Sequence, residues 1–305
     1  ITKAGAEAAN FPFCTIEPNV GVVEVPDHRI YDLAAMFKPK KTTPAFTRFV
    51  DIAGLVAGAS KGEGLGNQFL SHIRETDAIA HVVRCFEDGN ITHVEGSIDP
   101  VRDMDIINTE LCLADLESVD KKKTKTAKLA QAGIKQAKAD LPVLEKVYDA
   151  LQNGTPARAL DLSDDDLEVL KELNLITLKP VLYVLNMAED DIADPLANEY
   201  VQAASKEAEK EGAKWVPISA EIEEEVSELD GEEAKAFLAD LGEEEPGLNR
   251  LIRTAYSMLG LINFFTVGPD ECRSWTVRAG TKAPKAAGKI HSDIERGFIR
   301  AEIVS

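Results

Sequence analysis

Phe49-Val50-Asp51-Ile52-Ala53-Gly54 is the stretch of the sequence that decides its fold. The apolar residues before Asp51 predict a buried strand, and a D-x-x-G pattern begins where that strand ends. An Asp in this position can support a magnesium ion through a water, and the Gly amide can meet a terminal phosphate. D-x-x-G also occurs by chance at strand-to-turn junctions, so the surrounding sequence must decide between the two interpretations.

The segment after the strand is rich in glycine. Residues 54–66 contain five glycines in thirteen positions, and glycine has the most backbone freedom to lose on ordering. A mobile loop behind a metal-associated Asp is what a nucleotide switch requires, and the alternative is an ordinary flexible loop. Upstream, Thr15 is the candidate for a second magnesium ligand, since a hydroxyl can join the metal shell.

Several short segments of nearly continuous apolar character predict strands buried on both faces. They are Thr47–Ile52, Ala78–Phe86, Val181–Leu185 and Lys214–Ile218, with Gly21–Val25 as a further edge strand. Helical patterns at Glu63–Glu75 and Pro195–Glu211 lie between them. This alternation predicts the α/β class, with a parallel sheet covered by helices on both faces.

Polar turns follow the last two of these strands. Asn186-Met187-Ala188-Glu189 comes after one of them, and Ser219-Ala220 comes after the other. Ligands bind at the carboxyl ends of strands in open α/β sheets. The order of Thr15, D-x-x-G, N-x-x-E and S-A therefore predicts a P-loop nucleotide hydrolase, a G domain.

The first of the two turns bears on the choice of base. Guanine-binding relatives of this fold carry N-K-x-D there, and the Asp accepts hydrogen bonds from guanine. Met187 stands in place of that Lys and Glu189 in place of that Asp. Because the longer Glu is not expected to sit where the Asp does, guanine specificity is weakened, although a preference for adenine does not follow from this alone.

Residues 99–178 contain no clear strand. Apolar spacing over Asp99–Asp120 and Thr126–Leu151 predicts two long helices, an inserted hairpin similar to a coiled coil. Residues 121–138 carry seven lysines and no acid, and we expect them around the second arm and the tip. They are either a solvated helix face or a surface that meets phosphates, and the lack of acidic neighbours favours the second.

The last part of the chain changes character. A helix is expected at Leu248–Leu259, and strands at Phe264–Val267, Arg273–Val277 and Ile299–Val304 predict the start of a small β-rich domain. Basic side chains in this part offer a second phosphate-facing cluster, consisting of Lys282, Lys285, Lys289, Arg296 and Arg300.

Composition limits the class of protein. The 305 residues allow two or three domains. A net charge of -19, with twelve acids and one Lys in residues 221–245, argues against a general nucleic-acid coat. No apolar run approaches the roughly 20 residues that cross a bilayer. The four cysteines form no C-x-x-C pair, so a cytoplasmic protein that contacts no membrane is expected.

The whole chain resembles the YchF family, also called Obg-like ATPases. The resemblance rests on residues 10–19 (NFPFCTIEPN), 51–56 (DIAGLV), 61–67 (KGEGLGN), 287–291 (AGKIH) and 297–300 (GFIR). It implies a G domain in residues 1–98 and 179–262, an inserted helical coiled coil in 99–178, and a partial TGS domain in 263–305. It also implies hydrolysis of ATP, often in preference to GTP, with magnesium, and association with ribosomes and ribosomal RNA. We expect a monomer.

The same resemblance assigns roles to single residues. His93 is the implied catalytic group, because Leu55 stands where Ras-like enzymes have a water-positioning Gln, and an apolar side chain cannot orient water. The alternative is a solvent-exposed loop histidine. The complete set is His93, Asp51 and Gly54 for catalysis, Asn186, Met187, Glu189, Ser219 and Ala220 for the nucleotide, and Thr15 and Asp51 for magnesium.

The family's G-x-x-x-x-G-K-S phosphate loop is absent from the sequence. The resemblance places it immediately before Ile1, so this chain is expected to be inactive alone and to belong to an active protein. Two other functions stay open: a guanine-specific GTPase of the same fold, and a ribosome-binding module that hydrolyses nothing.

Overall fold

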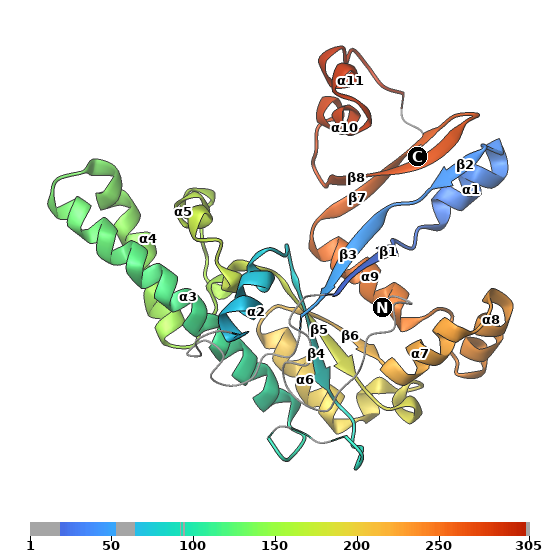
Figure 1. Cartoon of the computed structure of the whole chain (residues 1–305), viewed down its shortest axis with the longest axis horizontal. Helices are drawn as coiled ribbons and strands as arrows, with labels where there is room; N and C mark the ends of the chain where they lie inside the picture. Colours follow the sequence, from blue (N-terminus) through green and yellow to red (C-terminus); the bar gives the residue numbers. More distant parts are fainter. Residues whose placement is uncertain (1–18, 53–64, 92, 94, 303–305) are drawn as a thin grey trace. The chain divides into compact units, whose positions relative to one another are not determined.

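The computed structural model describes residues 19–52, 65–91, 93 and 95–302 of the chain, and Figure 1 traces its elements. The chain divides into two compact units, and each is described by itself. The larger comprises residues 50–247, and the smaller comprises residues 20–49 and 248–305. The division into a G domain, a coiled coil and a TGS domain remains a prediction.

The larger unit is built on a parallel three-stranded sheet in the order β4-β5-β6. The strands are β4 (Ile79–Arg84), β5 (Val181–Asn186) and β6 (Lys214–Ile218). They confirm three of the predicted strands. The first five residues of β5 are buried, because β5 is the central strand and is covered on both faces.

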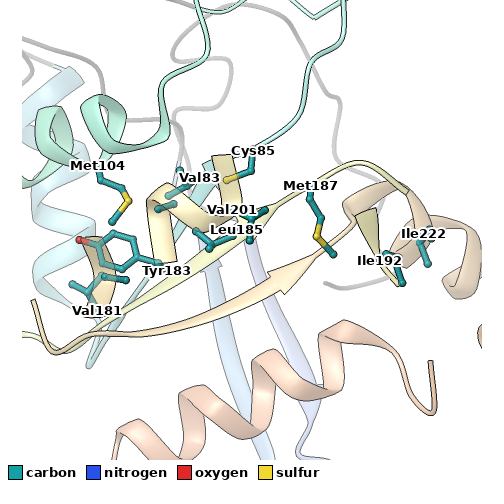
Figure 2. Close-up of a cluster of buried hydrophobic side chains, with 12 residues drawn as sticks. Val83, Cys85, Met104, Val181, Tyr183, Leu185, Met187, Ile192, Val201 and Ile222 are labelled. Atoms are coloured by element: carbon teal, nitrogen blue, oxygen red, sulfur yellow. The ribbon is translucent and has the colours of Figure 1, made fainter. Parts of the chain in front are cut away.

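The hydrophobic core of the larger unit lies against β5. Tyr183 and Leu185 lie two residues apart and so face the same side of the sheet. Figure 2 shows them with Met104, Val201 and other members of one buried cluster. The helices of this unit that follow β5 in the chain are α6 (Glu199–Lys210), α7 (Ala220–Glu228) and α8 (Gly231–Asp240).

The predicted hairpin is present as two packed helices, α3 (Pro100–Gln131) and α4 (Lys135–Gln152), drawn in green in Figure 1. The expected end of the first helix at Asp120 was wrong, because α3 continues for a further eleven residues. Buried Thr126 and Ala130 extend its inner face, which keeps the helix packed. The chain reverses at Gly133, whose φ of +89° favours glycine.

The lysine cluster lies elsewhere on the hairpin than expected. Its members from Lys121 to Lys128 are on α3, the first arm, and only Lys135 and Lys138 are on α4. Three of the lysines also have acidic partners. Their ion pairs are Lys121–Glu117 at 2.5 Å, Lys122–Glu172 at 2.7 Å and Lys123–Asp120 at 3.3 Å. Residues 121–138 contain no acid because Glu117 and Asp120 lie just before them in α3, while Glu172 is distant in the sequence and is brought close by the fold.

A fully buried carboxylate fixes the base of the hairpin. Asp115 of α3 accepts hydrogen bonds at 2.7 Å from both the backbone N–H and the hydroxyl of Thr177. Thr177 belongs to the short 3-10 helix η4 (Ile176–Leu178). The other Asp115 oxygen lies 2.9 Å from the guanidinium of Arg74, at the end of α2 (Leu65–Arg74). Three separate segments therefore meet on one side chain.

The described strands of the smaller unit form two sheets. β1 (Asn19–Glu24) pairs with β3 (Phe46–Asp51), whose last two residues belong to the larger unit. The second sheet consists of β2 (Lys41–Thr43), β8 (Glu271–Arg278) and β7 (Leu261–Val267). Among the described strands, the pairing partner of β3 is β1. Its Phe49 packs in a cluster with Val25 and Ile252.

The helices of the smaller unit change the expected end of the chain. They are α1 (His28–Phe37), α9 (Gly247–Met258), α10 (Ala283–Ile290) and α11 (Ser292–Arg296). Residues 299–302 form no strand, and Ile299 is 92% exposed. The expected strand at Ile299–Val304 is thus wrong over these residues. No helix among the described residues has the length and apolarity to cross a membrane.

Asp115 provides a test of this packing. Replacing it with Ala should lower the free energy of unfolding by about 3 kcal/mol, because Arg74 and Thr177 lose a buried partner. Urea denaturation measures the change. The control is Glu117→Ala on the same helix. The Glu117 carboxylate is exposed, so its removal should change the free energy of unfolding by less than about 0.5 kcal/mol. Equal losses in the two variants would contradict the role of Asp115.

Candidate functional site

Asn186 joins the ends of all three parallel strands. Its carbonyl accepts a hydrogen bond of 2.7 Å from the N–H of Cys85, just past β4. The next N–H, of Met187, donates to the carbonyl of Ile218 on β6 at 2.9 Å. The Asn186 side-chain oxygen accepts from the N–H of Ala220 at 2.9 Å. The predicted N-x-x-E and S-A turns are therefore neighbours in space, as their positions at strand ends required.

The S-A turn opens α7. Ser219 is its N-cap residue, but its side chain makes no capping hydrogen bond. The Ser219 hydroxyl is buried and has no hydrogen-bond partner among the described residues. Buried hydroxyls are normally paired, and an N-terminal helix turn presents N–H donors and a positive dipole end. This polar corner suits an acceptor-rich group such as a nucleotide base or phosphate.

The other two predicted site residues of the N-x-x-E turn, Met187 and Glu189, differ in their exposure to solvent. Met187 is 3% exposed, and its side chain lies in the core near Ile192 and Ile222 (Figure 2). Glu189 is exposed and begins a short 3-10 helix. The turn thus offers a ligand the Glu189 carboxylate and the backbone around Met187, but not the Met187 side chain.

Asn198 supports the same turn and was missed in the sequence. Its side-chain oxygen caps α6 by accepting from Tyr200 and Val201, at 2.8 and 3.1 Å. Its side-chain nitrogen donates to the Cys85 carbonyl at 3.0 Å and to Asp191 at 2.6 Å. An Asn before a helical pattern is a recognisable N-cap signal, although its contact with Cys85 depends on tertiary structure.

The loop after β4 is braced by one arginine. The Arg84 guanidinium donates to three carbonyls of this loop, those of Phe86, Asp88 and Ile91, at 3.0–3.2 Å. At the loop's start, burial raises the pKa of the Cys85 thiol to about 12, so this cysteine stays protonated and is not a nucleophile. The bracing fixes the path of the chain towards His93.

His93 is half-buried and faces the start of α3. Its Nε2 lies 2.9 Å from a carboxylate oxygen of Asp103, and its Nδ1 accepts from the N–H of Glu95 at 3.1 Å. It is not the freely exposed loop histidine that was the alternative. Asp103 was not identified from the sequence, because a single acid ten residues away carries no local signal.

The remaining predicted residues are described only in part. Asp51 is the last residue of β3 and is exposed, while Thr15 and Gly54 lie outside the described residues. The described part of the chain holds no cluster of three metal-ligating side chains. Asp51 fits a magnesium site as a single carboxylate ligand that acts through water, the oxygen chemistry that this ion prefers.

Two family models match the chain. Residues 1–111 match a model described as "50S ribosome-binding GTPase". Residues 261–305 match the YchF-GTPase_C model, described as "Protein of unknown function". The first of these matches spans the predicted residues Thr15, Asp51, Gly54 and His93.

Known proteins resemble the chain over its whole length. It is 53% identical over 305 residues to "Ribosome-binding ATPase YchF" of Bacillus subtilis, covering all of this chain and 83% of that protein. It is 54% identical to the Haemophilus influenzae protein of the same name, with the same coverage. Among solved structures, the Schizosaccharomyces pombe YchF GTPase matches with a TM-score of 0.82 and 43% identity, over 95% of this chain and 79% of that one.

Ser219 gives a test that needs no ligand. We expect Ser219→Ala to leave the free energy of unfolding unchanged or to raise it by about 1 kcal/mol, because an unpaired buried hydroxyl is removed. Denaturation without nucleotide measures this. Ser205→Ala is the matched control, since the buried Ser205 hydroxyl donates to the Gln202 carbonyl at 3.1 Å and its loss should destabilise. A large loss at Ser219 would mean that the hydroxyl is already satisfied.

Proposed function

The chain belongs to the YchF family, and from that premise we propose that it is a ribosome-associated nucleotide hydrolase that prefers ATP to GTP. In this role it acts as a translation-linked switch in the cytoplasm, as a monomer. The names of the bacterial relatives support ATP and the ribosome. The observation that supports the proposal is the junction at Asn186, whose hydrogen bonds bring the polar ends of the three parallel strands together at one edge of the sheet.

The base would be held by the two turns at that edge. The Ala220 N–H and the Asn186 amide lie beside the start of α7. Ser219 supplies a buried hydroxyl, and Glu189 supplies an exposed carboxylate. Because Met187 is buried in the core, selection between adenine and guanine rests on Glu189 and the backbone. The Glu189 carboxylate does not match the reach of the guanine-binding Asp, which weakens the specificity for guanine. The preference for ATP is supported by the names of the bacterial relatives.

The phosphate end would involve Asp51, Gly54 and Thr15. Magnesium, when bound with the nucleotide, neutralises charge on the phosphate oxygens. Asp51 would hold it through a water and Thr15 through its hydroxyl, while the Gly54 amide meets the terminal phosphate. Since Leu55 cannot orient a water, His93 would position the attacking one.

A guanine-specific GTPase of the same fold is the second candidate. Two names support this candidate. The family model that matches residues 1–111 is described as a GTPase, and so is the fission-yeast protein of known structure. A ribosome-binding module without hydrolysis is the third, and it would leave His93 without a role. Nucleotide affinities separate the first two candidates, and replacement of His93 separates the third.

His93→Ala should lower ribosome-stimulated ATP hydrolysis by about a hundredfold in the complete protein, because general acid–base and water-positioning groups contribute on that order. ATP affinity should stay the same, since the imidazole is proposed to act on the water. Phosphate release with and without ribosomes measures the effect. His28→Ala is the control, because His28 is an exposed residue of α1. An unchanged rate in His93→Ala removes the catalytic role.

The lysines of the hairpin tip are the proposed contact with ribosomal RNA. Lys125, Lys128, Lys135 and Lys138 are exposed, and none of them has an ion-pair partner in the described part of the chain. The coiled-coil arms would present these four charges, and the basic cluster near α10 in the proposed TGS domain would add a second contact.

We expect Lys125→Gln with Lys128→Gln to weaken ribosome binding and to lower the slope of log affinity against log salt by about 1.5, because two phosphate contacts are lost. Lys121→Gln with Lys122→Gln is the matched control, since both lysines are already paired with acids. Equal effects from the two double variants would show that the tip carries no special contact.

A further inference from the structure

Both ring nitrogens of His93 are occupied. Nδ1 accepts a hydrogen bond of 3.1 Å from the Glu95 N–H, so the neutral ring carries its proton on Nε2. Nε2 then donates to an Asp103 carboxylate oxygen at 2.9 Å. The side chains of His93 and Asp103 are 17% and 21% exposed, so water competes little for this bond.

Asp103 is itself fixed in place. Its second carboxylate oxygen accepts from the guanidinium of Arg102 at 2.9 and 3.1 Å. The same guanidinium donates to the Ser97 carbonyl at 2.7 Å and to the Ser97 hydroxyl at 3.0 Å. Asp103 lies in the first turn of α3, whose positive dipole end favours a carboxylate. The partner of His93 is therefore a rigid part of the helix.

A histidine that orients a water must offer a ring nitrogen to it. In this arrangement neither nitrogen is free, so His93 cannot act until one bond opens. We propose that Asp103 is a restraining residue that holds His93 in a resting position, and that movement of α3 releases it. The proposal rests on the proposed catalytic role of His93, which it extends to regulation.

α3 connects this pair to the hairpin tip. It is a single helix of 32 residues, about 48 Å long at ~1.5 Å per residue. Asp103 is in its first turn, and the exposed Lys125 and Lys128 are near its other end. A ligand that tilts or shifts the hairpin arm would displace the Asp103 carboxylate relative to the loop that carries His93. Ribosome binding at the tip would thereby raise hydrolysis.

The chemical reactivity of the His93 ring tests the restraint without any turnover. Diethyl pyrocarbonate acylates an available imidazole nitrogen, and mass spectrometry of the complete protein gives the rate at each histidine. His28, which is 86% exposed, serves as the internal reference. In Asp103→Ala the rate at His93 relative to His28 should rise about two- to tenfold, as expected for loss of one hydrogen bond. In Asp103→Asn, which keeps a hydrogen-bond acceptor but loses the charge, the relative rate at His93 should lie between that of the parent protein and that of Asp103→Ala.

Asp105→Asn is the matched control, because it removes a carboxylate from the same end of α3 without touching the ring. It should leave the relative rate at His93 unchanged. An unchanged rate in Asp103→Ala would overturn the proposal. Circular dichroism of each variant establishes that α3 is intact, and Asp103→Asn preserves the test if the Ala variant unfolds.

Hydrolysis then separates restraint from catalysis. Asp103→Ala should raise ATP hydrolysis without ribosomes by about two- to tenfold and reduce the further stimulation by ribosomes. The double variant with His93→Ala should be as slow as His93→Ala alone. A fall in the rate of Asp103→Ala would overturn the proposal, because Asp103 would then orient the active imidazole. If His93→Ala leaves hydrolysis unchanged, the proposed function of His93 fails, while the acylation rates still decide whether Asp103 holds the ring.

Discussion

The hydrogen bonds of Asn186 are the constraint on which the larger unit depends. At the end of the central strand, the Asn186 carbonyl accepts a hydrogen bond from the Cys85 N–H just after β4, and its side-chain oxygen accepts one from the Ala220 N–H at the start of α7. The next N–H, of Met187, donates to a carbonyl of β6. Because β5 is buried on both faces, this residue cannot shift without moving the core. The polar turns are thus held at one edge by the packing of the sheet, which is how an open α/β sheet makes a rigid ligand site from loops.

The same sheet sets the position of the proposed catalytic loop. The segment after β4 is braced by Arg84, and His93, which follows it, contacts Asp103 in the first turn of α3. α3 is held near its first turn by the packing of Met104 in the β5 cluster, and near its middle by Asp115. Because α3 carries both the hairpin lysines and Asp103, one helix links the tip to the residue that contacts His93.

The sequence predicted the parts of this structure that depend on local pattern. The runs at Val181–Leu185 and Lys214–Ile218 are strands within one residue of the expected bounds, because burial on both faces leaves a continuous apolar signal. Pairing was not predictable in this way: β3 has the same kind of run but pairs with β1. The burial of Met187, the pairing of Lys122 with Glu172 and the contact of Asp103 with His93 depend on tertiary packing, which leaves no trace in a local window. Glu117 and Asp120 are different, because they pair with Lys121 and Lys123 across one turn of α3 and lie just before the stretch of lysines.

Equilibrium binding of magnesium-ATP and magnesium-GTP to the complete protein and to Asn186→Ala is the most direct test of the site. Asn153→Ala is the control, because Asn153 is an exposed amide at the end of α4. We expect the parent protein and the control to bind ATP more tightly than GTP. We expect Asn186→Ala to bind ATP about tenfold more weakly, because the free energy of about one hydrogen bond is lost and the two turns are no longer held together. Binding that is unaffected by the loss of Asn186, or a parent protein that binds neither nucleotide, would contradict the assignment of this sheet edge as the nucleotide site.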